Sequence, residues 1–246
     1  MSIKSNAERG IEIYKKTGLI TVIKKGIRYF YARSISLIGS TLYSVNSEKY
    51  WNFRMKYDWS FVGGGDQTSY FVAGMFANLC NSFDPKKIST IIDYGCATGD
   101  SAIFLKIFFP NSNISLYDIS DIGVEKALLK YSRFIPVDRH KEEDRYDLVY
   151  SSNVIEHVNN PKEFVKKLVD LSKKLVVIQC PYKEMHPKNK KLISPKNKSD
   201  EHIWTIDEEF IKKYIEDERM EWELKTGIVP MAWQGGVQAF IVGKLK

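Results

Sequence analysis

The chain has 246 residues, 43% of them hydrophobic and 27% charged, as in a globular protein with one large domain and an appendage. Its net charge of +7 is uneven: residues 1–45 contribute +6, residues 183–198 contribute +5, and the remainder of the chain is mildly acidic. This distribution favours a locally attracted anionic partner and argues against a protein whose whole surface follows nucleic acid.

The cysteines and the N-terminal composition indicate where the protein works. Cys80, Cys96 and Cys180 form no CxxC pair, and their odd number argues against a disulfide framework, so we expect a cytoplasmic location. No signal peptide is visible. The longest uncharged run near the N-terminus, residues 34–47, has 14 residues, whereas a membrane span needs about 20. We therefore expect no membrane crossing.

Residues 1–45 are predicted to form a basic amphipathic helical extension to a domain at 46–246. Ile20, Ile23 and Ile27 recur at helical spacing, with lysines between them. Such a helix either packs on the domain with its lysines in water or lies on an anionic membrane surface. In the second case residues 13–45 would attach the protein peripherally to the inner face of the membrane.

The next segment is rich in aromatic residues and is interrupted by three consecutive glycines, Gly63, Gly64 and Gly65. Because glycine is unfavourable inside helices and strands, we expect a flexible loop there, which either covers a ligand or serves as a hinge. A helix is predicted to follow over residues 69–81.

From Ile88 onward, strands and helices alternate. Strands are predicted at 90–94, 114–118, 134–137, 147–151 and 175–179, and helices at 100–109, 123–131 and 161–171. This alternation predicts an α/β fold with a parallel sheet and helices on both faces, its core spanning 88–246. After a lysine-rich insert at 183–198, Thr205 and Glu208 suggest a capping box for a helix that ends near 217. Two strands then complete the chain.

The stretch IIDYGCATGD, residues 91–100, places a glycine turn at a strand end, where open parallel sheets bind ligands. A P-loop needs a lysine after the last glycine, but Asp100 stands there. In a dinucleotide site, an acid at this helix start would repel pyrophosphate. The remaining class is a cationic nucleoside without phosphates. Asp93 suits its amino group and Asp118 its ribose diol, unless both residues only cap helices.

Three segments together resemble motifs of the class I S-adenosylmethionine-dependent methyltransferases. IIDYGCATGD, ISLYDIS and YDLVYSSNVIEHV are similar to the first, second and fourth motifs, over roughly residues 88–180. The resemblance implies a Rossmann-like sheet of seven strands with the last one antiparallel, and S-adenosyl-L-methionine as cofactor. Ala97 departs from the usual central glycine. An acidic contact to adenine would fall near Asp138. The implied cofactor-binding residues are Asp93, Gly95, Ala97, Gly99, Asp118, Ile119, Asn153 and Gln67.

Two histidines are candidates for the chemistry. His157 follows the fourth strand, and His202 precedes the last predicted helix, positions that in similar enzymes lie near the methyl-transfer centre or the acceptor. We expect one of them to remove the acceptor proton, although each can equally be a structural histidine. Glu156 either holds a histidine or the acceptor, or caps a helix, and we favour the cap. The sequence assigns no metal ligands.

The acceptor is expected to be a hydroxyl compound. Neither a cysteine nor the Asn/Asp-Pro-Pro-aromatic signature of amine methylation follows the fourth strand. The segment before the first motif loosely resembles methyltransferases of surface-glycan gene clusters, which implies O-methylation of a sugar or glycan. The lysines of 183–198 would attract a phosphorylated one. The alternatives are an RNA methyltransferase and a non-catalytic scaffold that binds the cofactor.

Overall fold

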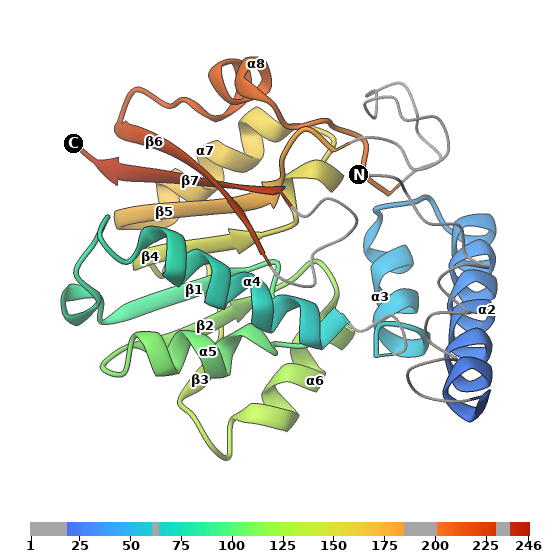
Figure 1. The fold of residues 1–246 in the computed structure, drawn as a ribbon. Coiled ribbons are helices and arrows are strands. Elements are labelled where there is room, and N and C mark those ends of the chain that lie inside the picture. The colour runs from blue at the N-terminus through green and yellow to red at the C-terminus, as the bar shows by residue number, and fades with distance from the viewer. Residues whose placement is uncertain (1–18, 61–63, 185–200, 230–236) are drawn as a thin grey trace.

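The computed structural model describes residues 19–60, 64–184, 201–229 and 237–246 as a seven-stranded sheet between two layers of helices (Figure 1). The strand order is β3-β2-β1-β4-β5-β7-β6. The strands are β1 (Thr90–Tyr94), β2 (Asn113–Tyr117), β3 (Val137–Arg139), β4 (Tyr146–Ser152), β5 (Ser172–Pro181), β6 (Met220–Ile228) and β7 (Val237–Leu245). The helices are α2 (Leu19–Leu42), α3 (Glu48–Tyr57), α4 (Gly64–Leu79), α5 (Ser101–Phe108), α6 (Asp121–Tyr131), α7 (Pro161–Leu171) and the short α8 (Glu208–Phe210).

The strand directions confirm the predicted Rossmann-like architecture. Strands β3, β2, β1, β4 and β5 run parallel, and β7 is antiparallel to both of its neighbours, β5 and β6. Because β1 lies at the centre with β2 on one side and β4 on the other, the chain reverses its direction of winding there. The carboxyl ends of β2, β1 and β4 therefore form the crevice in which such sheets bind ligands.

Two hydrophobic cores, one on each face of the sheet, explain why the strand sequences are almost continuously apolar. Side chains alternate between faces along a strand, so Ile91 packs under α4, α5 and α6, whereas Ile92 packs under α7 and α8. In β5, Val177 packs in the same core as Ile91, and Val176 packs in the same core as Ile92. All four are less than 1% exposed, so both faces exclude water along the whole centre of the sheet.

The N-terminal extension lies beside the sheet, with α3 between α2 and the domain (Figure 1). Ser47 caps α3 by accepting a hydrogen bond from the backbone N–H of Tyr50. One face of α2 is buried at Gly39, where any side chain would meet the Phe53 ring at about 3.0 Å. Within the described residues, none of the helices combines the length and apolarity needed to cross a membrane.

Two sequence expectations about local structure are wrong. The glycine run does not form a loop throughout, because α4 begins at Gly64. A Cβ on Gly64 would lie 2.2 Å from the Trp59 ring and one on Gly65 2.8 Å from the Asp100 carboxylate, so these glycines permit close packing. The last helix is capped by Asp207, whose carboxylate accepts from Phe210 N at 2.8 Å, and it continues only as a π-helical turn.

The remaining expectations are confirmed to within a few residues, or fall outside the described residues. Strand β3 starts three residues later than predicted, because the chain first turns after α6. Gly63, most of the insert at 183–198, and the turn at Gly235 and Gly236 lie in the parts of the chain that the structure does not describe.

Candidate active site

A cavity of about 520 Å³ opens at the carboxyl ends of β2, β1 and β4, within the usual size range of small-molecule sites. We call its two ends the β2 side and the β4 side. The β2 side is lined by Gly95, Ala97, Asp118 and Ile119. The β4 side is lined by His157, Glu201, His202, Trp51 and Arg54. Asn153, Gln67 and Thr68 contribute to the wall as well.

The glycine turn after β1 has a backbone that few other residues could adopt. Gly95, Ala97 and Gly99 have φ angles of 95°, 49° and 72°, in the left-handed region that favours glycine. A Cβ on Gly95 would lie 2.2 Å from a methyl group of Val154. One on Gly99 would lie 2.5 Å from the Cβ of Ala127. The turn is thus packed directly against the segment that follows β4 and against α6, and bare backbone faces the cavity.

Asp118 fixes this turn from the neighbouring strand. Its carboxylate accepts hydrogen bonds from the backbone N–H groups of Ala97 and Ser120, both at 2.8 Å. Burial raises the pKa of Asp118 to about 6, against the opposing effect of these two amides. Because each carboxylate oxygen has a second lone pair, Asp118 can still accept hydrogen bonds from a ligand.

Asp93, in contrast, lies beneath the turn and is not among the residues that line the cavity. It is 2% exposed, and Ser101 Oγ donates a hydrogen bond to it. Burial raises the pKa of Asp93 to about 7, and the nearby charge of Asp118 acts in the same direction. An ionised Asp93 is therefore a poorly solvated charge that a cation nearby would stabilise.

Asn153, directly after β4, is the most unusual polar residue in the wall. Its φ angle is 52°, and neither its side-chain oxygen nor its nitrogen has a hydrogen-bond partner within the described residues. Buried polar groups without partners are rare and often face a ligand. Tyr94 and Tyr117 stack nearby, with ring centroids 4.3 Å apart, so the wall also has an aromatic part.

The two histidines meet at the β4 side although 45 positions separate them in the chain. Their ring centroids lie 4.8 Å apart at an interplanar angle of 78°. His157 Nδ1 lies 2.9 Å from the backbone oxygen of Glu201, and His202 Nδ1 lies 2.5 Å from Oε2 of Glu184. Trp51 of α3 contacts the His157 ring edge-on, with centroids 5.2 Å apart.

The surroundings of the two imidazoles favour opposite protonation states. Burial, together with the neighbouring His202, lowers the pKa of His157 to about 3. Burial acts against the charge of His202 too, but the hydrogen bond that its ring donates to Glu184 and the charge of Glu156 raise its pKa to about 9. At neutral pH, His157 is therefore neutral and His202 is protonated.

A buried ion-pair network ties the N-terminal helices to this side of the cavity. Arg54 donates from Nε to both oxygens of Asp58 at 2.7–2.8 Å, and its Nη1 donates to Glu201 and to Tyr50 Oη. Tyr50 Oη also donates to Glu201. Although burial opposes ionisation, the charge of Arg54 lowers the pKa of Glu201. The network holds Glu201, and with it the carbonyl that orients His157.

The sequence profile of the methyltransferase-domain family matches residues 70–218, which is more than half of the chain. The chain belongs to this family. A comparison with curated proteins found no significant match.

Solved structures of methyltransferases share the fold at low sequence identity. The magnesium protoporphyrin IX methyltransferase of Synechocystis PCC 6803, with bound S-adenosylhomocysteine, has a TM-score of 0.52 and 16% identity, covering 76% of this chain and 85% of its own. A putative methyltransferase of Haloferax volcanii, in complex with the activator Trm112, has a TM-score of 0.60 and 12% identity. The match covers 79% of this chain and 97% of that protein. The N-methyltransferase NodS of Bradyrhizobium japonicum WM9 has a TM-score of 0.51 and 11% identity. The match covers 71% of this chain and 93% of NodS. With the family match, they identify S-adenosylmethionine as the cofactor of this methyltransferase.

Sequence reasoning did not identify several residues of this methyltransferase that shape the β4 side. Trp51 and Arg54 belong to the aromatic-rich segment before the glycine run, which by sequence points to no site, and nothing in the sequence distinguishes Asn46 or Glu201. Asn46 has a φ angle of 65° and donates to the Glu201 carbonyl at 2.7 Å, but only the tertiary contact reveals this. Asp138 is exposed on β3 and is not among the cavity residues.

Proposed function

We propose that this methyltransferase methylates a hydroxyl group of a sugar or glycan, with the acceptor at the β4 side of the cavity. The observation that carries the proposal is the histidine pair. His157 is neutral and lines the cavity next to His202, so the pair can make a hydroxyl nucleophilic. An amine acceptor in its neutral form would not need such a group.

The residues of the β2 side fit the cofactor. When bound, S-adenosylmethionine supplies a methyl group that its sulfonium has already activated. We assign the ribose hydroxyls to Asp118, because its carboxylate lines the cavity and is held in place by backbone amides. Asn153 has the unpartnered amide that a buried polar ligand would satisfy. Gly95, Ala97 and Gly99 let the ligand approach the backbone, while Ile119 and Gln67 complete the wall.

Asp93 would act from below the turn. Its burial beneath the turn suits an effect on the ammonium group of the cofactor through the backbone or a water molecule, and not the direct contact that the sequence also allowed. A positive charge nearby would favour the ionised form of this buried carboxyl, whose pKa burial raises. Cofactor binding and proton release from Asp93 would then be coupled.

The direct route for the acceptor uses His157 as the base. With its Nδ1–H donated to the Glu201 carbonyl, the neutral ring carries its lone pair on Nε2. The hydroxyl proton would pass to this nitrogen as the acceptor oxygen takes the methyl group, and the cofactor, when bound, would supply that group and leave as S-adenosylhomocysteine. The cation on His202 would stabilise negative charge on the acceptor oxygen. Cys96 and Cys180 take no part, since burial raises the pKa of both thiols.

The anionic character of the acceptor is supported by charge alone. Residues 183–198 contain six lysines and one glutamate, and at the start of this segment, just after β5, Glu184 contacts His202 of the β4 side. We therefore favour a phosphorylated sugar or glycan. The test is methyl transfer from isotope-labelled S-adenosylmethionine to a panel of nucleotide sugars, polysaccharides, amines and total RNA. A methyl ether on a sugar is expected; label found only on amines or RNA would contradict the proposal.

We also propose that α2 rests on the anionic inner surface of a membrane. Ile20, Ile27, Phe30 and Leu37 are each 64–71% exposed and follow one another along the outer side of the helix. The basic residues of 1–45 supply attraction to anionic lipids. The test is the fraction of protein that sediments with vesicles containing phosphatidylserine. The double variant Ile27→Asp/Phe30→Asp should lose most of the fraction that binds in the wild type. Equal binding of both proteins would contradict this role.

A further inference from the structure

The β4 side contains a buried carboxylate that the mechanism so far leaves without a role. Glu156 is 1% exposed, and neither of its oxygens has a hydrogen-bond partner within the described residues. It caps no helix, contrary to the expectation from sequence. A buried carboxylate without hydrogen bonds is costly even with the charge of His202 nearby, and buried charges are normally hydrogen-bonded or bind a metal. The group therefore calls for a ligand.

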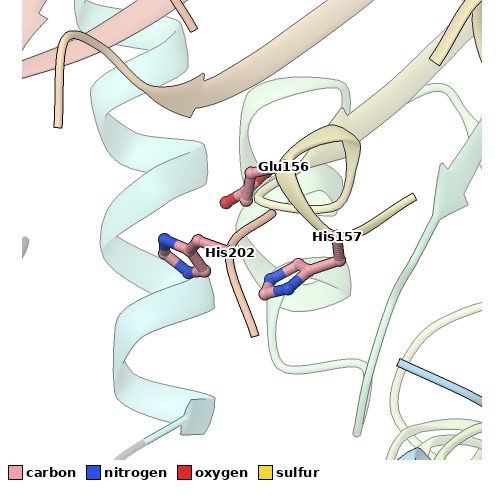
Figure 2. A group of neighbouring side chains, drawn as sticks. All are labelled: Glu156, His157 and His202. Atoms are coloured by element: carbon pink, nitrogen blue, oxygen red, sulfur yellow. The ribbon is translucent and has the colours of Figure 1, made fainter. Parts of the chain in front are cut away.

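The histidines provide the other ligand atoms of such a site. One carboxylate oxygen of Glu156 and one ring nitrogen each of His157 and His202 lie within 4.8 Å of one another. Figure 2 shows that Glu156 and His157 come from the same short turn after β4, while His202 faces them from a separate segment. The cluster is thus assembled by the fold, from chain positions 45 residues apart.

The outer contacts of both imidazoles are those of metal-binding histidines. A ligating histidine usually donates its other ring N–H to a backbone carbonyl or a carboxylate, which fixes the ring and its tautomer. His157 Nδ1 lies 2.9 Å from the Glu201 carbonyl oxygen, and His202 Nδ1 lies 2.5 Å from the Glu184 carboxylate. With Nδ1 donating in these contacts, the neutral His157 ring carries its lone pair on Nε2, and His202 would present the same lone pair once a metal displaces its Nε2 proton to water.

We infer that Glu156, His157 and His202 bind one divalent transition-metal ion, with zinc as the best-suited probe. Two imidazoles and one carboxylate form a set of three protein ligands that leaves coordination positions open, as in catalytic zinc sites. Bonds of roughly 2.0–2.1 Å would place ligand atoms about 3.3 Å apart in a tetrahedron. Side-chain rotations would have to close the present spacing of up to 4.8 Å.

The ion would deepen the proposed function, on which this part of the inference rests. His157 and His202 line the cavity, so an open coordination position would face the acceptor. An acceptor hydroxyl bound there would have a lower pKa and would lose its proton to water. Its oxygen would then form the C–O bond as the methyl–sulfur bond breaks, with no change in the charge of the ion. The imidazoles would serve as ligands, and not as the base.

The test measures metal binding independently of catalysis. The full chain, freed of any affinity tag and dialysed against a chelator, is titrated with Zn²⁺ by calorimetry and with Co²⁺ by visible absorption. Glu156→Gln and His202→Gln keep the shape of the site but weaken the ligand set. His140→Gln is the matched control, because His140 contacts Tyr146 and is not among the cavity residues. All proteins carry Cys80→Ser, since the exposed Cys80 thiol could bind zinc itself.

We expect one equivalent of Zn²⁺, affinity at least tenfold lower in Glu156→Gln and His202→Gln, and no change in His140→Gln. Circular dichroism and binding of S-adenosylhomocysteine verify that the variants fold. The inference would be overturned if the wild-type chain bound no stoichiometric Zn²⁺, or if all variants bound Zn²⁺ with equal affinity. Sugar methylation by a chain that binds no metal would reject the metal site alone. Metal binding without methylation of any hydroxyl acceptor would reject the proposed function alone.

Discussion

The two sides of the cavity are built in different ways. The β2 side consists of residues at the ends of adjacent parallel strands. Most of its wall is the backbone of the glycine turn, which the carboxylate of Asp118 holds in place. The β4 side consists of side chains from α3, from the turn after β4, and from residues 201–202, and Glu184 supports it through His202. Its charged groups contact one another, as in the pairs of Arg54 with Glu201 and His202 with Glu184.

This difference suggests a division of labour. A backbone cradle is insensitive to most side-chain changes, which suits a cofactor that never varies. A side-chain network can change its charge and shape residue by residue, which suits an acceptor that differs between enzymes of one fold. Variants of the β2 side should therefore alter cofactor affinity, and variants of the β4 side should alter turnover while cofactor affinity stays unchanged.

The largest effect is expected at the histidine pair. His157→Ala and His202→Ala should each lower kcat about 10²–10⁴-fold, because the acceptor hydroxyl can no longer be ionised. The double variant should lose little more, because both act on one step. Initial rates at saturating S-adenosylmethionine test this, and calorimetry should give affinity for S-adenosylhomocysteine within a factor of about three of wild type. Near wild-type turnover in both single variants would show that the β4 side does not ionise the acceptor hydroxyl.

A substitution in the glycine turn should act on binding. Gly95→Ala places a methyl group 2.2 Å from Val154 at a φ angle of 95°, so we expect affinity for S-adenosylhomocysteine to fall about a hundredfold. The double variant Gly95→Ala/Val154→Ala removes the clash but not the backbone strain and should recover part of the loss. Calorimetry measures both. A Gly95→Ala protein with normal affinity for S-adenosylhomocysteine and reduced kcat would contradict the proposed division between a β2 side that binds the cofactor and a β4 side that controls turnover.

Asp93→Asn should separate stability from binding. Burial raises the Asp93 pKa to about 7, above its ordinary value near 4, so the folded state binds this proton more tightly than the unfolded state. The carboxyl therefore costs stability progressively as pH rises from about 4 to 7. At pH 8 the variant should gain on the order of 2–4 kcal/mol in the free energy of unfolding, at about 1.4 kcal/mol per pKa unit, and bind the cofactor at least tenfold more weakly.

Asp147→Asn is the matched control for this change. Although burial opposes it, hydrogen bonds from Ser89 and Lys174 lower the pKa of Asp147 to about 2. This carboxylate contributes stability that is complete above about pH 4 and is lost as pH falls towards 2, so its replacement should destabilise the protein at pH 8. Chemical denaturation at pH 5 and pH 8 measures both variants. Loss of stability at pH 8 in Asp93→Asn as well would refute the linkage.

The smallest effect is expected from charge outside the cavity. Replacing Lys188, Lys190 and Lys191 by Gln should raise KM for an anionic acceptor about threefold to tenfold and flatten its dependence on salt, with kcat unchanged. A neutral acceptor serves as the control and should show no difference. If KM and its salt dependence stay the same for the anionic acceptor, the segment does not recruit it.

The sequence predicted the β2 side because its residues follow strand ends in regular order. Parallel pairing of β1 and β2 alone brings Gly95 and Asp118 together at the cavity wall and places Asp93 beneath the turn. The β4 side could not be predicted in the same way. Glu201 reaches the site through contacts with Tyr50 and Arg54, about 150 positions earlier, and spacing carries no signal for such contacts.

The glycine run was misread for a related reason. Flexibility and close packing both favour glycine, and only the neighbours decide between them. Here the Trp59 ring and the Asp100 carboxylate occupy the space that side chains at Gly64 and Gly65 would need. The start of α4 is thereby packed against the end of the glycine turn, and Gln67 and Thr68 reach the cavity wall.

Glu184 and Glu201 stand at the two boundaries of the segment 185–200, and each is joined to one imidazole. The stretch between them is therefore tethered at both ends to the reactive centre. Its length and sequence could be exchanged between relatives without displacing either ring. New acceptor preferences could thus evolve by grafting a different insert between two unchanged glutamates.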